Sequence, residues 1–252
     1  WIDLAKNIKM TIQSKGKRPV GRTITRLSLQ SKIVLTMTLF LLTLGTVGFY
    51  LLEHRNPATM GSLSIAGKLQ ASFFQSVTTR TAGFASISQS GLTNGSKLLA
   101  CMLMIIGGSP AGTAGGIKTT TVAVLLLTAI SVLRGNKDTE CYGRKITFEI
   151  IRVGMTITLV TFVFWLFGVT VMTVIEPQQK VLDLMYEATS AMATVGLTAD
   201  LTPVLSDISH VVLMLMMYIG RIGPMTMALI FSGHADKKNQ FRTLPEAKIM
   251  VG

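Results

Sequence analysis

Long runs of apolar residues, separated by short polar stretches, dominate the chain. Two of them, residues 33–52 and 153–175, hold 20 and 23 residues and contain no charged side chain. About 20 apolar residues in a helix suffice to cross the roughly 30 Å hydrocarbon core of a bilayer. A third run, residues 208–231, is long enough as well, although Arg221 lies inside it. The pattern predicts an all-α membrane protein.

A glycine-rich stretch separates two further apolar segments, residues 98–106 and 122–133. Counted as one helix, residues 98–133 would be about 54 Å long at 1.5 Å per residue, so we expect the helix to break. Irregular backbone at membrane depth survives only where it is buried in protein or lines a watery cavity. A break that carries a lysine therefore suggests a path for a solute. The candidate residues of the break are Gly107, Gly108, Ser109, Pro110, Ala111, Gly112, Thr113, Ala114, Gly115, Gly116 and Lys118.

This stretch does not fit a nucleotide-binding loop. Such a loop needs a glycine directly before its lysine, whereas Ile117 separates Gly116 from Lys118. Pro110 also precedes the loop where a strand would be needed. The spacing of Gly112 and Gly116 is typical of helix packing in membranes, but the surrounding glycines disfavour a continuous helix.

Composition and charge agree with a membrane protein. Charged residues make up 14% of the 252 residues, against about a quarter in soluble domains. The net charge of +12 would suggest nucleic acid as a partner, but eight basic residues precede residue 33, four lie in 134–145 and four follow residue 236. Alternating spans place these segments on one side, which the positive-inside rule makes cytoplasmic. We expect membrane lipid and no nucleic acid as a partner.

The start of the chain is not a cleaved signal peptide, because 32 mostly polar residues precede the first span. Because Trp1 and not Met begins the chain, we expect a part of a longer protein. Two cysteines, one of them in an apolar run, predict no disulfide framework.

One order of elements occurs twice: a span, a short helix, a Thr-x-Gly turn and a second span. The short helices, residues 68–79 and 181–192, would be about 18 Å long, too short to cross a membrane. Each leads into a turn, and the glycines of the two turns, Gly83 and Gly196, are 113 residues apart. Both short helices enter from the same side, so the repeat is direct.

The chemistry of this unit is dehydration of a cation. A helix that ends at mid-membrane directs roughly half a negative charge toward the bilayer centre, and carbonyl oxygens of the following turn can replace the water around an ion. Glycine permits backbone angles closed to other residues. We predict an ion selectivity filter that binds K⁺ through backbone oxygens near the two glycines. Its residues are Thr81, Ala82, Gly83, Thr194, Val195 and Gly196.

At these motifs the sequence resembles the Trk/Ktr/HKT superfamily of potassium transporters, most closely the membrane subunit of bacterial Ktr systems. The resemblance rests on residues 79–84, the Gly-Gly-Ile-Lys-Thr-Thr-Thr of residues 115–121, Gly196, residues 220–226 and the ending 245–252. In that family four such units surround a single pore. By order and ending, the two units here resemble the third and fourth, so the other two pore units of the same polypeptide are expected partners.

The resemblance implies a role for each motif. It makes Gly83 and Gly196 filter glycines, residues 107–119 an intramembrane gating loop, and Arg221 a pore-facing barrier beside that loop. It further implies a homodimer, a cytosolic nucleotide-binding (RCK-type) ring as regulator, transported K⁺, and Na⁺ as activator, with no organic cofactor in this chain. Location in the bacterial cytoplasmic membrane follows.

The predicted organisation has five parts. Residues 1–32 form a basic cytoplasmic segment, 33–134 the third pore repeat with its broken second helix, and 135–145 a cytoplasmic loop. Residues 146–233 form the fourth repeat and 234–252 a cytoplasmic tail. We predict K⁺ uptake and no enzyme activity; the alternatives are a secondary transporter with a substrate site at the broken helix, or a soluble nucleotide- or nucleic-acid-binding protein.

Several charged residues allow plainer roles. Arg80 directly precedes the first filter, and we expect it to point away from the pore and pair with an acidic group. Asp183 and Glu187 share one face of the second short helix and suit packing or the outer rim. Asp200 suits either the outer mouth of a pore or an ordinary loop.

Overall fold

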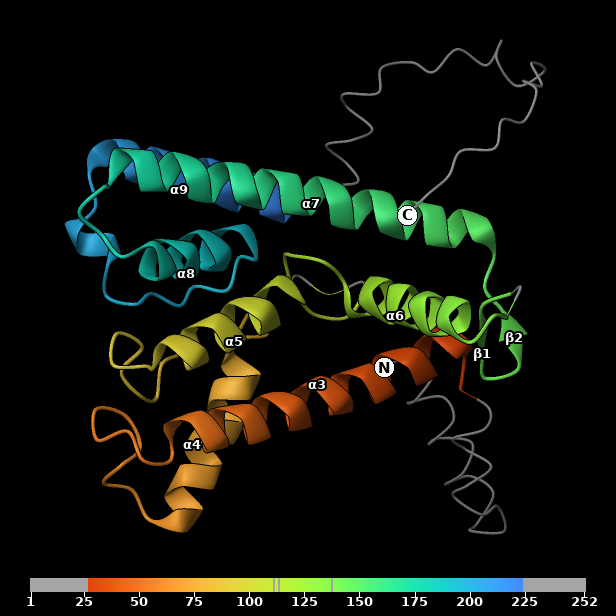
Figure 1. Ribbon diagram of the computed structural model, residues 1–252, viewed down its shortest axis with the longest axis horizontal. Coiled ribbons are helices and arrows are strands. Elements are labelled where there is room, and N and C mark those ends of the chain that lie inside the picture. The colour runs from red at the N-terminus through yellow and green to blue at the C-terminus, as the bar shows by residue number, and fades with distance from the viewer. Residues whose placement is uncertain (1–26, 111, 113, 137, 224–252) are drawn as a thin grey trace, which may run out of the picture.

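The computed structural model describes residues 27–110, 112, 114–136 and 138–223, and within them helices connected by loops make up nearly all of the regular secondary structure (Figure 1). The ordered elements are α3 (Leu29–Glu53), α4 (Ile65–Thr78), α5 (Asn94–Ile105), α6 (Thr119–Leu133), β1 (Glu140–Cys141), β2 (Arg144–Lys145), α7 (Phe148–Ile175), α8 (Val181–Met192), the 3₁₀ helix η1 (Thr202–Val204) and α9 (Asp207–Ile222).

Two of the described helices, α3 and α7, are long and apolar enough to cross a membrane, with 25 and 28 residues. The threonines along them do not interrupt this apolar character, because hydroxyls such as those of Thr46 and Thr161 donate to carbonyls of their own helix at 2.7 Å. The third predicted span corresponds to α9, which has 16 residues up to Ile222. The rest of that predicted span lies outside the described residues.

The helix breaks over the glycine-rich stretch: α5 ends at Ile105 and α6 begins at Thr119. The first short helix, α4, starts at Ile65, three residues before its predicted start, because Ser64 accepts a hydrogen bond from the Gly67 N–H and caps the helix there. The second short helix, α8, has the predicted bounds.

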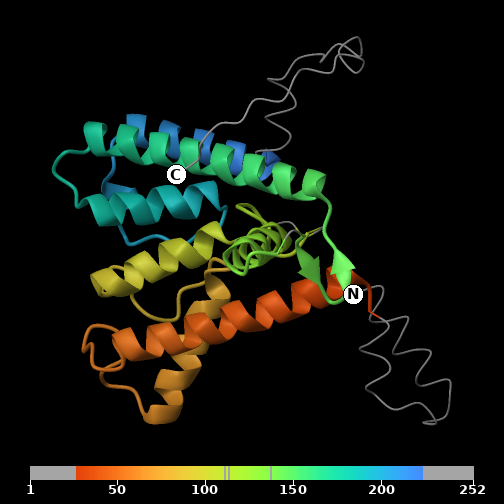
Figure 2. The same cartoon turned by 45° about the vertical axis from the view of Figure 1, so that its right-hand side comes forward.

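A small hairpin departs from the all-α prediction. Strands β1 and β2 pair antiparallel within the segment predicted as a loop. The two residues between them, Tyr142 and Gly143, have φ of 49° and 72°, the left-handed conformations that a tight hairpin turn requires. Figures 1 and 2 both show the hairpin beside the first turns of α3, where Lys32 Nζ lies 5.7 Å from the centre of the Tyr142 ring.

Helix α8 lies at the centre of the packing. It contacts α5, α7 and α9, and both Leu184 and Tyr186 on it are fully buried. Helices α7 and α9 run side by side over it (Figures 1 and 2). On the other side of the molecule, α4 packs mainly against α3. The second short helix is therefore more enclosed than the first.

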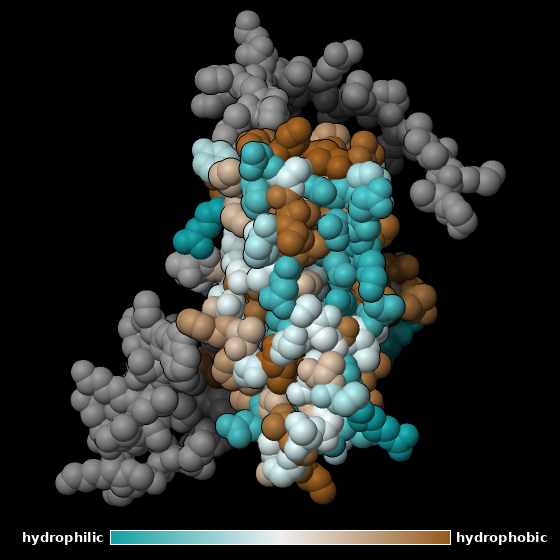
Figure 3. Space-filling view, turned by 90° about the vertical axis from the view of Figure 1, so that its left-hand side faces the viewer, coloured by the Kyte–Doolittle hydropathy of each residue, from teal (hydrophilic) through white to brown (hydrophobic). Residues whose placement is uncertain are grey.

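The helices that follow the two turns begin in the same way. Thr93 caps α5 and Ser206 caps α9, and the two caps are 113 residues apart, the spacing of Gly83 and Gly196. A glutamate accepts the backbone N–H of each cap: Glu53 from Thr93 at 2.9 Å and Glu176 from Ser206 at 2.8 Å. Negative charge at a helix N-terminus is stabilising. These connections lie at the end of the molecule seen in Figure 3, over which many polar residues are spread.

Candidate functional site

The turns that follow α4 and α8 have the same backbone conformation. Thr81 and Gly83 have φ of 66° and 76°, and Thr194 and Gly196 have φ of 52° and 91°. A threonine pays about 1–2 kcal/mol for a left-handed conformation, so the surrounding structure must hold both turns. The conformation is a property of the turn and not of one local sequence, because Ala82 in the first turn is replaced by Val195 in the second.

The structure brings the two turns into contact. A Cβ atom built on Gly83 would lie 2.5 Å from the carbonyl oxygen of Val195 and 3.5 Å from the Cα of Gly196. A Cβ atom built on Gly196 would lie 3.7 Å from the Cα of Gly83. The absence of a side chain at Gly83 is therefore what lets the main chains approach.

Each short helix ends at its turn, so its carbonyl end faces the turn. The first turn is closed by Thr78, whose hydroxyl accepts from the Phe84 N–H at 2.9 Å and donates to the Phe84 carbonyl at 2.6 Å. The segment after the second turn is held by Glu187, which accepts from the Thr198 hydroxyl at 2.6 Å and the Ala199 N–H at 2.9 Å. Glu187 thus has the packing role that its helix face suggested.

A buried hydrogen-bonded network links the two short helices, α4 and α8. The Gln75 side chain on α4 donates to Gln89 Oε1 at 2.7 Å, and the Tyr186 hydroxyl on α8 donates to the same oxygen at 2.8 Å. All three side chains are at most 3% exposed. A satisfied buried network of this kind fixes a single arrangement, so it sets the separation of α4 and α8.

Two more contacts join the halves nearer the polar end. Lys97 Nζ on α5 lies 2.6 Å from Asp183 Oδ1 on α8, with the lysine buried. The Ser90 hydroxyl donates to Asp200 Oδ2 at 2.6 Å. The sequence reading missed the lysine and the glutamines. The available signal was their polarity: Gln75 lies within a short amphipathic helix and Lys97 directly precedes an apolar run.

The stretch between α5 and α6 is a loop closed at its base by backbone hydrogen bonds. The Gly107 N–H donates to the Ile117 carbonyl at 2.9 Å, the Ile117 N–H to the Ile105 carbonyl at 3.0 Å, and the Thr119 N–H to the Gly108 carbonyl at 3.1 Å. These bonds satisfy main-chain groups that the break would otherwise leave unpaired.

This loop is hydrogen-bonded to a residue at each turn. The Gly115 N–H donates to the Thr194 hydroxyl at 3.0 Å, and Arg80 Nη2 donates to the Gly107 carbonyl at 3.2 Å. The expectation of an acidic partner for Arg80 is therefore wrong. The guanidinium bonds a carbonyl of the loop, and among the described residues its Nη1 has no hydrogen-bond partner.

The loop also carries positive charge. The Lys118 ammonium donates to the Ala114 carbonyl within the loop and lies close enough to Arg221, in the last turn of α9, for their charges to interact. Gly112 closes a tight turn onto the Ser109 carbonyl at 3.2 Å, next to Pro110. Two candidate residues, Ala111 and Thr113, lie outside the described residues.

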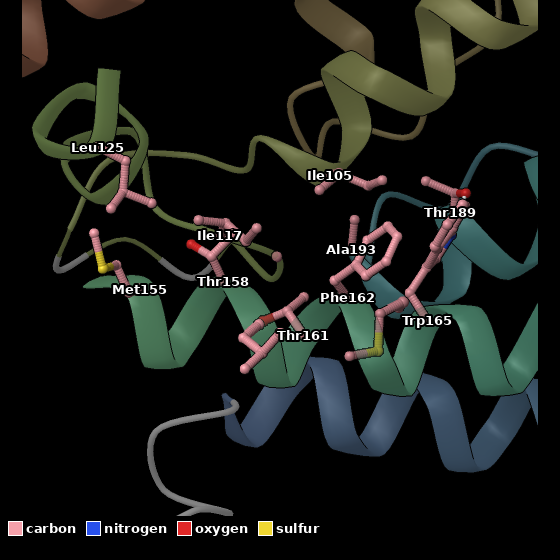
Figure 4. Close-up of a pocket in the computed structure, with 13 residues that line it drawn as sticks. Ile105, Ile117, Leu125, Met155, Thr158, Thr161, Phe162, Trp165, Thr189 and Ala193 are labelled. Carbon is pink, nitrogen blue, oxygen red and sulfur yellow. Dashed lines mark hydrogen bonds between the residues drawn. The ribbon is translucent and has the colours of Figure 1, made fainter. Parts of the chain in front are cut away.

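A cavity of about 450 Å³ lies between this loop and α7 (Figure 4). Loop residues Gly116 and Ile117 line one wall, and Phe162 and Trp165 of α7 line the other. Ala193, directly before the second turn, also reaches it. The cavity therefore touches both the loop and the end of α8.

The comparisons with known proteins identify the family. The model of the family TrkH, described as a cation transport protein, matches residues 17–242. The chain belongs to this family. The family agrees with the resemblance seen in the sequence: its members are cation transport proteins and not enzymes.

Characterised relatives cover nearly the whole chain. It is 37% identical over 232 residues to Ktr system potassium uptake protein B of Bacillus subtilis, an alignment with 92% of this chain and 51% of the relative. It is 38% identical to Ktr system potassium uptake protein B of Vibrio alginolyticus, with 90% and 49% covered. The potassium/sodium uptake protein NtpJ of Enterococcus hirae is 35% identical, with 91% and 51% covered. The chain spans about half the length of these relatives.

The fold is that of the same family. The crystal structure of the potassium transporter TrkH from Vibrio parahaemolyticus superposes with a TM-score of 0.65 at 16% sequence identity. The superposition covers 77% of this chain and 43% of the TrkH chain. The helical arrangement is thus shared, again over about half of the longer protein.

Proposed function

We propose that this chain forms half of a potassium-conducting pore and that the complete protein takes up K⁺ as the membrane subunit of a Ktr-type system. One observation carries the proposal: two turns of equal backbone conformation, each at the carbonyl end of a short helix, meet at Gly83 and Gly196. The names of the relatives, which are potassium uptake proteins, supply the ion.

The physical role of the turns is to replace water around the ion. A dehydrated cation needs several oxygens at fixed positions, and main-chain carbonyls can supply them. The ends of α4 and α8 add negative potential at the same place. We infer that the filter consists of residues 81–83 and 194–196, completed by the corresponding turns of two further pore units.

We infer that the loop at residues 107–119 is the gate. It lies next to the filter through its bonds to Thr194 and Arg80, and it places Lys118 near Arg221. Two positive charges beside an ion path raise its energy for a cation, so displacement of the loop would lower that barrier. Breaking the hydrogen bonds of the loop to Thr194 and Arg80 costs about 1 kcal/mol each.

The proposed topology places the basic loop 134–145 and both ends of the chain in the cytoplasm, in a bacterial inner membrane. By family resemblance the partners are a second copy of the protein and a cytosolic RCK-type nucleotide-binding ring, with Na⁺ as activator. A secondary transporter is less well supported, because α4 and α8 follow their spans in the same order and an inverted repeat is lacking in the described chain.

Complementation tests the function directly. The complete gene, introduced into a bacterium without its own potassium uptake systems, should restore growth at low external K⁺. The matched control is the same gene with Gly83→Asp, which places a bulky charged side chain against the Val195 carbonyl and should not restore growth. Equal growth of both strains, or growth of neither despite normal membrane expression, contradicts the proposal.

A further inference from the structure

The cavity beside the loop is closed on one side by protein and open on the other toward the apolar surface of α7. Met155, Leu159 and Phe162 line it and are 52%, 64% and 52% exposed. Ile117 and Ala193, on the opposite wall, are 6% and 1% exposed. Figure 4 shows the side chains from α7 and those from the loop and the end of α8 facing each other across the space.

The threonine and tryptophan side chains that line the cavity already have hydrogen-bond partners within the protein. Thr158 and Thr161 donate their hydroxyls to carbonyls one turn earlier in α7, at 2.9 and 2.7 Å. The Thr189 hydroxyl accepts the Trp165 indole N–H at 2.8 Å. A charged or strongly polar ligand would find no partner here, and cavities of this type stay dry and take apolar guests.

The size and position of the cavity indicate which apolar guest it suits. A volume of about 450 Å³ is roughly three times that of an engineered cavity that binds benzene, enough for a flexible hydrocarbon segment. Helix α7 is long and apolar enough to cross the bilayer, and an apolar face exposed on a helix that crosses the bilayer suits contact with acyl chains. The cavity extends from this exposed face of α7 inward to the loop.

We propose that this cavity binds an acyl chain of a membrane phospholipid and that the bound chain supports the loop. Hydrocarbon in the cavity fills the space into which Gly116 and Ile117 would otherwise move, and so it holds the Gly115–Thr194 hydrogen bond in place. The binding site itself rests only on the cavity and the membrane; its effect on ion flux rests on the proposed function.

Photolabelling of the full-length protein tests the site. In vesicles of phosphatidylcholine with a diazirine in one acyl chain, the label should appear on Ile117 or Ala193, which bulk lipid cannot reach. Thr158→Trp, which fills the cavity, should reduce this label about fivefold or more, and the smaller Thr158→Leu should reduce it less. The matched control is Thr170→Trp, because Thr170 is an exposed α7 residue with the same hydroxyl-to-carbonyl bond, at 2.8 Å, outside the cavity.

Label confined to the outer face of α7, at Leu166 and Phe167, would show that another part of the protein closes the cavity and would overturn the proposal. Equal label on Ile117 in Thr158→Trp and Thr170→Trp would do so as well. Because labelling is measured without an ion gradient, it does not depend on whether the protein conducts K⁺. In flux measurements on the same vesicles Thr158→Trp should lower K⁺ flux, since the added ring supports the loop permanently; unchanged flux contradicts the coupling to the loop.

Discussion

The contact between the two turns predicts unequal effects of the same substitution at Gly83 and Gly196. Serine at either position must adopt a left-handed backbone, since φ is 76° and 91°, at a cost of about 1–2 kcal/mol. The surroundings differ. At Gly83 the new Cβ lies 2.5 Å from the Val195 carbonyl oxygen, whereas at Gly196 its nearest neighbour is 3.7 Å away.

The closer contact at Gly83 involves a carbonyl oxygen that we expect to bind the ion. Cβ atoms essentially never lie 2.5 Å from a carbonyl oxygen, so Gly83→Ser must displace the main chain of the first turn, of the second turn, or of both. A loss of 1.4 kcal/mol in the preference for K⁺ over Na⁺ corresponds to a tenfold change in ratio. We expect Gly83→Ser to lower the K⁺/Na⁺ uptake ratio roughly tenfold or more, and Gly196→Ser to lower it clearly less.

The assay is initial uptake of K⁺ and Na⁺ by cells that express the complete protein. Gly135→Ser is the matched control, because Gly135 has the same backbone strain, φ of 71°, but no atom within 4 Å of its added Cβ and no place in the turns. It should leave the ratio unchanged. Equal ratios in the wild type and both filter variants would refute the filter, and a larger effect at Gly196 than at Gly83 would refute the contact on which the ranking rests.

Three further variants test the surroundings of the turns. Deletion of residues 112–116 should raise K⁺ flux several-fold in vesicles, because it removes the bond to Thr194; unchanged flux excludes the gate. Tyr186→Phe removes one hydroxyl from the buried network and should cost about 1 kcal/mol in thermal unfolding, whereas exposed Tyr218→Phe should cost nothing. Hydrogen bonds from Ser206 lower the pKa of Glu176 from its ordinary value of 4.5. The carboxylate therefore stabilises the fold above pH 4.5, and this stabilisation is lost as the pH falls below that value. The unfolding temperature of Glu176→Gln should fall less on acidification than that of the wild type.

The apolar pattern of the sequence was sufficient to predict two helices of membrane length, α3 and α7, and the break between α5 and α6. Helices α3 and α7 follow from uninterrupted apolar runs of membrane length, and the break follows because glycine and proline cluster where a continuous helix would be too long. Local rules of this kind depend on neighbours in the chain. Helix α4 starts three residues before its predicted start because the Ser64 side chain caps it, a hydrogen bond that an apolar pattern does not reveal.

Contacts between distant segments could not be derived in this way. Nothing near Arg80 in the sequence shows that its partner is the carbonyl of Gly107, 27 residues later, because any main-chain oxygen can accept from a guanidinium. The same holds for Gln89 and Tyr186, which are 97 residues apart. Charge and polarity indicated that such residues needed partners, and only the folded chain supplied them.

The two short helices differ in a way that bears on the two further pore units proposed for the complete protein. Ile65, Leu69, Phe73 and Val77 form one stripe along α4 and are 78%, 56%, 51% and 36% exposed. Helix α8 has no such stripe, because α5 of the first unit covers it together with α7 and α9 of its own unit. If each unit covers the short helix of the next, the stripe on α4 is the surface for the corresponding helix of a preceding unit. The exposed stripe on α4 is then the counterpart of the α8 surface that α5 covers. A ring of such contacts closes only when every unit both covers the short helix of one neighbour and has its own short helix covered by another.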